Sequence, residues 1–140
     1  MKKALLYSDG ASSGNPGEAG IGVVLELGGR TFEVSEYIGV TTNNVAEYTA
    51  LIKGLERAGA LGAGSVEAYA DSELLVRQIT GRYRVKDEKL RVLWEKAMRL
   101  TRDFAYFSIS HIPRELNKKA DGLAKAAVKK AHQRRTSATG

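Results

Sequence analysis

The chain lacks several features that would point to particular classes of protein. Its 140 residues include no cysteine, so neither a disulfide framework nor a thiolate metal site is possible. No apolar run approaches the roughly 20 residues of a membrane-spanning helix. The short apolar stretch near the N-terminus breaks off at Ser8 and Asp9, which argues against a signal peptide. We therefore expect a cytoplasmic protein without a membrane partner.

Composition and length describe an ordinary globular protein. Hydrophobic residues make up 43% of the chain and charged residues 27%, which excludes a disordered or collagen-like chain. A chain of this length fits one domain with a sizeable core. We expect a monomeric domain over residues 1–134, followed by a flexible basic tail over residues 135–140.

The net charge of +6 is unevenly distributed along the chain. Residues 1–81 contain 6 Lys and Arg against 10 Asp and Glu, whereas residues 82–102 contain 8 against 3 and residues 125–140 contain 5 against none. Acidic residues next to basic stretches suggest a cation site beside a surface that binds a polyanion. A solvated face with a charged tail would produce the same imbalance.

Hydrophobic periodicity predicts five strands and four helices. The expected strands cover residues 4–7, 21–27, 31–38, 66–70 and 104–112, and residues 10–20 are expected to form a loop. The expected helices cover residues 44–58, 72–79, 87–102 and 117–131. This order, βββαβααβα, predicts an α/β fold: a five-stranded mixed sheet with helices on both faces.

Two expected strands end in an aspartate, the first at Asp9 and the fourth at Asp71. Ligands of open α/β sheets collect beyond the carboxyl ends of the strands. If these two strands are parallel neighbours, both side chains emerge at one edge. Capping of the following helix by Asp71 and Ser72 is an alternative interpretation.

Two further acids lie about one turn into expected helices. Glu47 follows Asn44 by three residues, so a capping-box contact with the helix start is one interpretation. Asp121 flanks the apolar stripe of the last helix, where an unpaired carboxylate is costly. A bound cation would satisfy it, and so would a salt bridge to Lys118 or Lys125.

Together these four carboxylates indicate a metal centre. Since the chain has no cysteine and only two histidines, a cluster of oxygen ligands suits a hard cation, Mg²⁺ or Mn²⁺. Four negative charges repel one another unless they are neutralised, so two divalent ions are expected.

Four short motifs lie on the expected elements in chain order. They are residues 7–12 (YSDGAS) with 14–17 (GNPG), residues 41–47 (TTNNVAE), residues 70–72 (ADS) and residues 117–121 (NKKAD). Each is a weak signal by itself. In this order, and over nearly the whole chain, they resemble type 1 ribonuclease H.

The resemblance implies a metal-dependent endonuclease that cuts the RNA strand of an RNA–DNA hybrid and leaves 5′-phosphate and 3′-hydroxyl ends. It implies that Asp9 bridges two Mg²⁺ ions, for which Mn²⁺ can substitute. Asp121 would help to hold the ion that activates the attacking water. Glu47 and Asp71 would hold the ion that stabilises the leaving 3′-oxygen, as in other two-metal sites.

The resemblance also implies a substrate surface. Asn15, Asn43 and Asn44 are similar to family positions that contact the minor groove, where 2′-hydroxyls distinguish RNA from DNA. A turn at Asn15 and helix capping by Asn43 or Asn44 are local roles compatible with such contacts. The substrate-binding residues that we expect are Asn15, Thr42, Asn43, Asn44, Ser72, Arg82, Arg84 and Lys86.

The chain departs from some family members at three places, the first of which is Glu73, where they have Gln after the Asp-Ser pair. A basic protrusion is absent, and we expect the cations of the short segment 82–86 to replace part of its phosphate binding. The mobile-loop histidine that assists turnover in many members could correspond to His111. Because Pro113 closes an expected strand there, we favour Arg114 as the group nearest the site and leave both assignments open.

Three other functions fit parts of the sequence: a related nuclease acting on another nucleic acid, a non-catalytic hybrid-binding module, and a small-molecule metalloenzyme. Fold alone does not decide among them. The presence of all four carboxylates argues against a non-catalytic module. The basic segments and the three asparagines argue against a small substrate, so an RNA–DNA hybrid is the expected partner.

Overall fold

The computed structural model describes residues 2–139. Its strands are β1 (Lys3–Ser12), β2 (Gly17–Leu27), β3 (Arg30–Thr41), β4 (Ser65–Ala70) and β5 (Tyr106–His111). Its helices are α1 (Asn43–Ala60), α2 (Glu73–Ile79), α3 (Glu88–Thr101) and α4 (Lys118–Thr139), with a short 3-10 helix, η1, at Arg114–Leu116. The element order confirms the predicted βββαβααβα arrangement.

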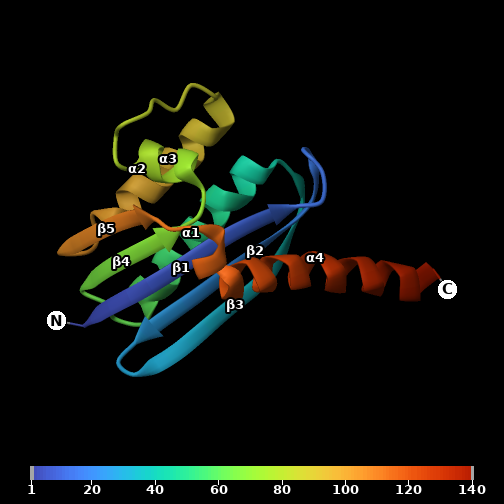
Figure 1. Cartoon of the computed structure of the whole chain (residues 1–140), viewed down its shortest axis with the longest axis horizontal. Helices are drawn as coiled ribbons and strands as arrows, with labels where there is room; N and C mark the ends of the chain where they lie inside the picture. The colour runs from blue at the N-terminus through green and yellow to red at the C-terminus, as the bar shows by residue number, and fades with distance from the viewer. Residues whose placement is uncertain (1, 140) are drawn as a thin grey trace.

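The strands form one mixed sheet in the order β3-β2-β1-β4-β5 (Figure 1). β1, β2 and β3 pair antiparallel as a meander. β4 pairs parallel with β1, and β5 pairs parallel with β4. The predicted sheet is therefore confirmed, and the carboxyl ends of β1 and β4 meet at one edge.

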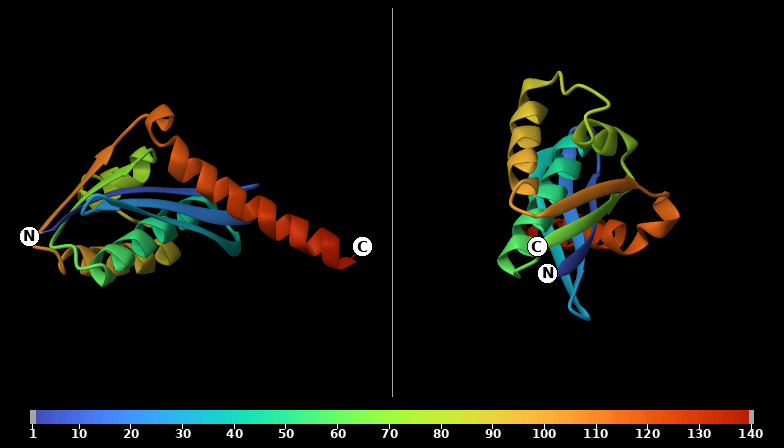
Figure 2. Two further views of the ribbon diagram at one scale, coloured as in Figure 1. Left: turned by 90° about the horizontal axis from the view of Figure 1, so that it is seen from below. Right: turned by 90° about the vertical axis from the view of Figure 1, so that its left-hand side faces the viewer.

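Helices cover both faces of the sheet (Figure 2). α1 packs on β1 and β2 with α3 beside it, whereas α4 crosses β2, β3 and β1 on the opposite face. Two glycines permit this close approach. A Cβ on Gly10 would lie 2.3 Å from the carbonyl carbon of Ala46 in α1, and one on Gly22 would lie 2.0 Å from the carbonyl oxygen of Ala120 in α4.

The main core lies between the sheet and α1. Leu6 and Val66 from neighbouring strands pack there with Leu51 and Leu55 of α1, and all four side chains are buried. Burial of each such side chain stabilises the fold by roughly 1.5–3 kcal/mol before entropic costs. The core thereby fixes α1 on the sheet.

The region expected to be a loop over residues 10–20 is mostly strand, so that prediction is wrong. β1 continues to Ser12 and β2 begins at Gly17, and the two pair from Gly10 with Ile21 to Ser12 with Ala19. Glycines there suggested a loop. Gly10 and Gly20 instead sit in the sheet, where a Cβ at either position would collide with a helix backbone.

The last helix is also longer than predicted. α4 ends at Thr139 rather than near residue 131, because no glycine or proline interrupts residues 123–139. Arg135 pairs with Glu18, and its guanidinium lies 5.5 Å from the centroid of the Tyr37 ring. Residues 135–139 of the expected tail thus continue the helix, and Gly140 lies outside the described residues. Across the described chain, none of the helices has the length and apolar character of a membrane span.

Candidate functional site

The parallel pairing of β1 with β4 brings two of the predicted acids to one edge. Ser8 pairs with Ala70, so Asp9 and Asp71 occupy the next positions on neighbouring strands. Asp71 follows the last residue of β4, as predicted. Asp9 lies inside β1 rather than at its end, because β1 continues to pair with β2 as far as Ser12. Its carboxylate therefore stands on a rigid strand.

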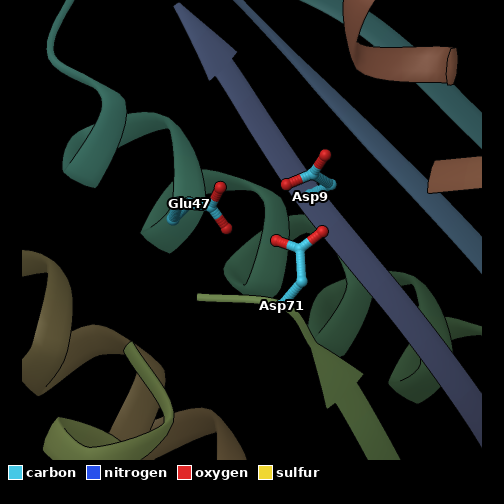
Figure 3. A group of neighbouring side chains, drawn as sticks. All are labelled: Asp9, Glu47 and Asp71. Carbon is cyan, nitrogen blue, oxygen red and sulfur yellow. The ribbon is translucent and has the colours of Figure 1, made fainter. Parts of the chain in front are cut away.

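α1 supplies the third acid. Its N-cap is Thr42, whose hydroxyl accepts a hydrogen bond from the Val45 N–H at 3.2 Å. Glu47 is therefore not the partner of a capping box at Asn44. Its side chain is 4% exposed and points toward Asp9, because Gly10 lets α1 approach β1 closely (Figure 3).

Asp9, Glu47 and Asp71 form a compact cluster of oxygens. Each offers one carboxylate oxygen, and these three atoms lie within 4.8 Å of one another (Figure 3). Burial, reinforced by the negative charge of Glu47, raises the pKa of Asp9 well above its ordinary value. Burial likewise raises the pKa of Glu47. Three carboxylates crowded together in this way form a site suited to a divalent cation.

An unpartnered atom supports the same conclusion. Among residues 2–139, the buried Oε2 of Glu47 has no hydrogen-bond partner. A buried carboxylate oxygen without a partner carries a desolvation penalty that a coordinated cation would offset. The donors are all oxygens, which suits Mg²⁺ or Mn²⁺.

Asp121 of α4 lines the same cavity of about 340 Å³ as the other three acids. Its two oxygens lie 3.0 Å from Lys125 Nζ and 3.8 Å from an Arg114 guanidinium nitrogen. Partial burial opposes ionisation, but hydrogen bonding to Asp9 and the charge of Lys125 hold the pKa of Asp121 below its ordinary value. The predicted salt bridge between Asp121 and Lys125 is present, and both residues line the cavity.

Arg114 and His111, the two candidates for assisting turnover, differ in whether they line the cavity with the acids. Arg114 begins η1 and lines the cavity with the four acids. His111 is the last residue of β5, pairs with Ala70, and is absent from the described lining of this cavity. Lys125 also lines the cavity, although sequence reasoning treated it only as a possible partner of Asp121. Its spacing of four residues along a helix was the available signal.

The three asparagines expected to bind substrate lie next to the acids. Asn43 lines the cavity, and its backbone N–H donates to Asn15 Oδ1 at 3.0 Å. Asn15, Asn43 and Asn44 are all exposed. Thr42 caps α1, whereas Ser72 caps α2 by accepting from the Leu75 N–H at 3.2 Å. Ser72, rather than Asp71, is thus the cap of α2.

Residues 82–86, the basic segment, contribute to the lining of a second cavity of about 540 Å³ between α2 and α3. Arg84, Lys86 and Arg91 supply its cations, whereas Arg82 is exposed on the same segment but is not among the described lining residues. Trp94 of α3 also lines it, and its indole N–H donates to the Gln78 carbonyl at 3.1 Å. Its full lining is Gln78, Gly81, Tyr83, Arg84, Val85, Lys86, Arg91 and Trp94.

The fold and the site define an α/β domain with a cluster of acidic side chains beside a basic segment. Residues 7–127 match a family model described as reverse transcriptase-like. The chain is 44% identical to ribonuclease HI of Halobacterium salinarum over 87% of its own length and 62% of that protein. It is 34% identical to ribonuclease H of Chlorobium phaeobacteroides, over 92% of the chain and 97% of that protein.

A solved structure agrees with these relatives. LC11-RNase H1 in complex with an RNA/DNA hybrid superposes with a TM-score of 0.86 at 44% identity, over 91% of this chain and 98% of that one. The chain belongs to the ribonuclease H family. It spans about three fifths of the length of the Halobacterium relative.

Proposed function

We propose that this chain hydrolyses the RNA strand of RNA–DNA hybrids, with two divalent cations as cofactor. The observation that carries the proposal is the convergence of Asp9, Glu47, Asp71 and Asp121 on one cavity that also contains Asn43 and Arg114. Membership of the ribonuclease H family, with a relative solved on an RNA/DNA hybrid, supports the same substrate.

The four carboxylates would hold Mg²⁺, for which Mn²⁺ can substitute because both accept oxygen ligands. When bound, such ions lower the pKa of a coordinated water and neutralise charge on the phosphate being cleaved. Asp9 interacts with both Glu47 and Asp121, so it would contribute to the binding of both ions. Hydrolysis at this site would leave a 5′-phosphate and a 3′-hydroxyl.

Two cations of the chain complement the acids. Lys125 and Arg114 both contact Asp121 and line the cavity. The Arg114 side chain is 71% exposed, so it can reach a phosphate above the acids. We assign Arg114 to assisting turnover, as a group that contacts the cleaved phosphate and aids its departure.

Substrate contacts extend on both sides of the acids. Asn15, Asn43 and Asn44 form an exposed polar edge that suits the 2′-hydroxyls of the minor groove, with Thr42 and Ser72 at the starts of the neighbouring helices. Beyond α2, the cations Arg82, Arg84 and Lys86 suit the phosphates of the hybrid. Because every group of this site comes from one chain, we propose that the protein acts as a monomer.

A panel of duplexes tests the proposal. Matched RNA–DNA, RNA–RNA and DNA–DNA duplexes are incubated with Mg²⁺, with Mn²⁺ and with a chelator. Efficient cutting of RNA only in the hybrid, and only with a divalent ion, is the expected result. Equal cutting of the all-DNA duplex or full activity in chelator would contradict the proposal, and tight hybrid binding without cleavage would indicate a non-catalytic module.

A further inference from the structure

One buried asparagine contacts the segments that carry three of the four acids, two through its side chain and one through its backbone. Asn117 lies between η1 and α4 and is 1% exposed. Its Nδ2 donates to the carbonyl oxygen of Ser8, the residue before Asp9, at 2.9 Å and lies 3.4 Å from Asp71 Oδ2. The backbone carbonyl oxygen of Asn117 accepts from the backbone N–H of Asp121 at 3.1 Å, in the first turn of α4.

From this juxtaposition we infer that Asn117 is a positioning residue for the metal centre. It fixes β1, the end of β4 and the start of α4 relative to one another, and so sets the separation of Asp9, Asp71 and Asp121. The inference rests on the proposed metal-dependent function and deepens it. Asn117 contacts neither substrate nor reacting atoms, and acts through the residues that would hold the ions.

The crowded acids make such a restraint necessary. The oxygens of Asp9, Glu47 and Asp71 lie within 4.8 Å of one another and repel before a cation arrives. Asp71 is the most exposed of the three and follows the last residue of β4, so its side chain is the one free to turn toward water. The Asn117 donor on its Oδ2 opposes that rotation and keeps the Asp71 carboxylate near the other two acids.

Stability alone does not account for an amide at this position. Within the described chain, the buried Oδ1 of Asn117 has no hydrogen-bond partner, so the side chain uses only its donor group. A buried polar group that is only partly satisfied offers less stability than a fully bonded one. The donor that it does use is directed at the segments carrying the acids.

The test replaces the donor and measures metal binding as well as activity. Asn117→Asp keeps the size of the side chain but replaces the N–H donor, and Asn117→Ala removes the group entirely. In the folded variants we expect Mg²⁺ affinity, measured by calorimetry without nucleic acid, to fall by about 10–100-fold. The kcat for hybrid cleavage falls by a similar factor, while KM stays within about twofold.

A matched control separates positioning from general damage. Tyr48→Phe also removes one buried hydrogen bond, the 2.6 Å bond from the Tyr48 hydroxyl to Gln78 Oε1. It should lower the melting temperature and leave Mg²⁺ affinity unchanged. Asn117 variants that behave in the same way, less stable but with full Mg²⁺ affinity, would overturn the inference.

A second measurement uses the unaltered chain. The side-chain amide protons of Asn117 should exchange slowly and shift when Mg²⁺ is titrated into the labelled protein, because one of their acceptors is Asp71. Titration that shifts other signals of the site but not this amide would overturn the inference and leave the proposed function standing. Failure of the unaltered chain to bind Mg²⁺ at all would instead refute the proposed function, and the inference with it.

Discussion

Replacing Asp9 by Asn should stabilise the metal-free protein while abolishing its activity. Asp9 is 3% exposed and lies against two other carboxylates, so burial and the charge of Glu47 raise the pKa of Asp9 in the folded state. Asparagine has nearly the same shape but no charge. The substitution therefore removes the free-energy cost of keeping this buried carboxyl protonated in the folded state, and it leaves the packing around β1 intact.

The pH dependence follows from the direction of that shift. Between the unfolded pKa, near 3.8, and the raised folded pKa, the folded protein holds a proton that the unfolded chain releases. The free energy of unfolding therefore falls as pH rises through this window, by at most about 1.4 kcal/mol per pH unit for one group. Since burial also raises the pKa of Glu47, the substitution removes only part of the slope. We expect Asp9→Asn to gain about 1–3 kcal/mol at pH 7.5.

Urea denaturation in chelator at several pH values between 5 and 9 measures this difference. The unaltered protein should lose stability as pH rises and regain it when Mg²⁺ is added, whereas Asp9→Asn should show a flatter curve and little response to Mg²⁺. Asp103→Asn, a change at an exposed aspartate, is the control and should behave like the unaltered protein. Stability of the metal-free protein that rises with pH, or a less stable Asp9→Asn at every pH, would refute the reasoning.

Two further predictions concern turnover and substrate binding. Arg114→Ala should lower kcat by about 10–100-fold and His111→Ala by much less, since Arg114 lines the cavity; steady-state kinetics that rank the two variants in reverse would restore His111 to the role. Changing the three cations of segment 82–86 to Gln should weaken hybrid binding and flatten the slope of log affinity against log salt by about 0.7–0.9 for each phosphate that is no longer neutralised, with kcat nearly unchanged. The matched control changes the three exposed cations of residues 129–134 to Gln, and a larger effect there would place the binding surface on α4.

The ligand-bearing edge could be predicted because it depends on local signals. A short apolar run before Asp9 and alternation before Asp71 mark two strands. The prediction depended on the condition that these strands are parallel neighbours, and the pairing of β1 with β4 meets that condition. Parallel neighbours bring both aspartates to one edge.

The features that could not be predicted from the sequence depend on which elements pack against one another. Gly10 and Gly20 have the composition of a loop, and only the helices lying against them explain why they belong to strands. Lys125 was expected only as an ion-pair partner of Asp121, and Trp94 was not among the expected site residues. That both also line cavities depends on how α4 and α3 sit on the rest of the fold.

Asn117 illustrates the same limit. Its motif placed it near the start of the last helix, where capping is the ordinary role of asparagine. Its partner Ser8 is 109 residues away in sequence, and its partner Asp71 is 46 residues away. No local pattern indicates such contacts.

Single-turnover cleavage of an RNA–DNA hybrid labelled on the RNA strand tests the central claim most directly. The unaltered chain is compared with four variants that change Asp9, Asp71 and Asp121 to Asn and Glu47 to Gln, each shown to be folded. We predict cleavage of the RNA strand by the unaltered chain only when Mg²⁺ or Mn²⁺ is present, with 5′-phosphate and 3′-hydroxyl products and a large loss of rate in every variant. Cleavage that persists in Asp9→Asn at the unaltered rate would contradict the account.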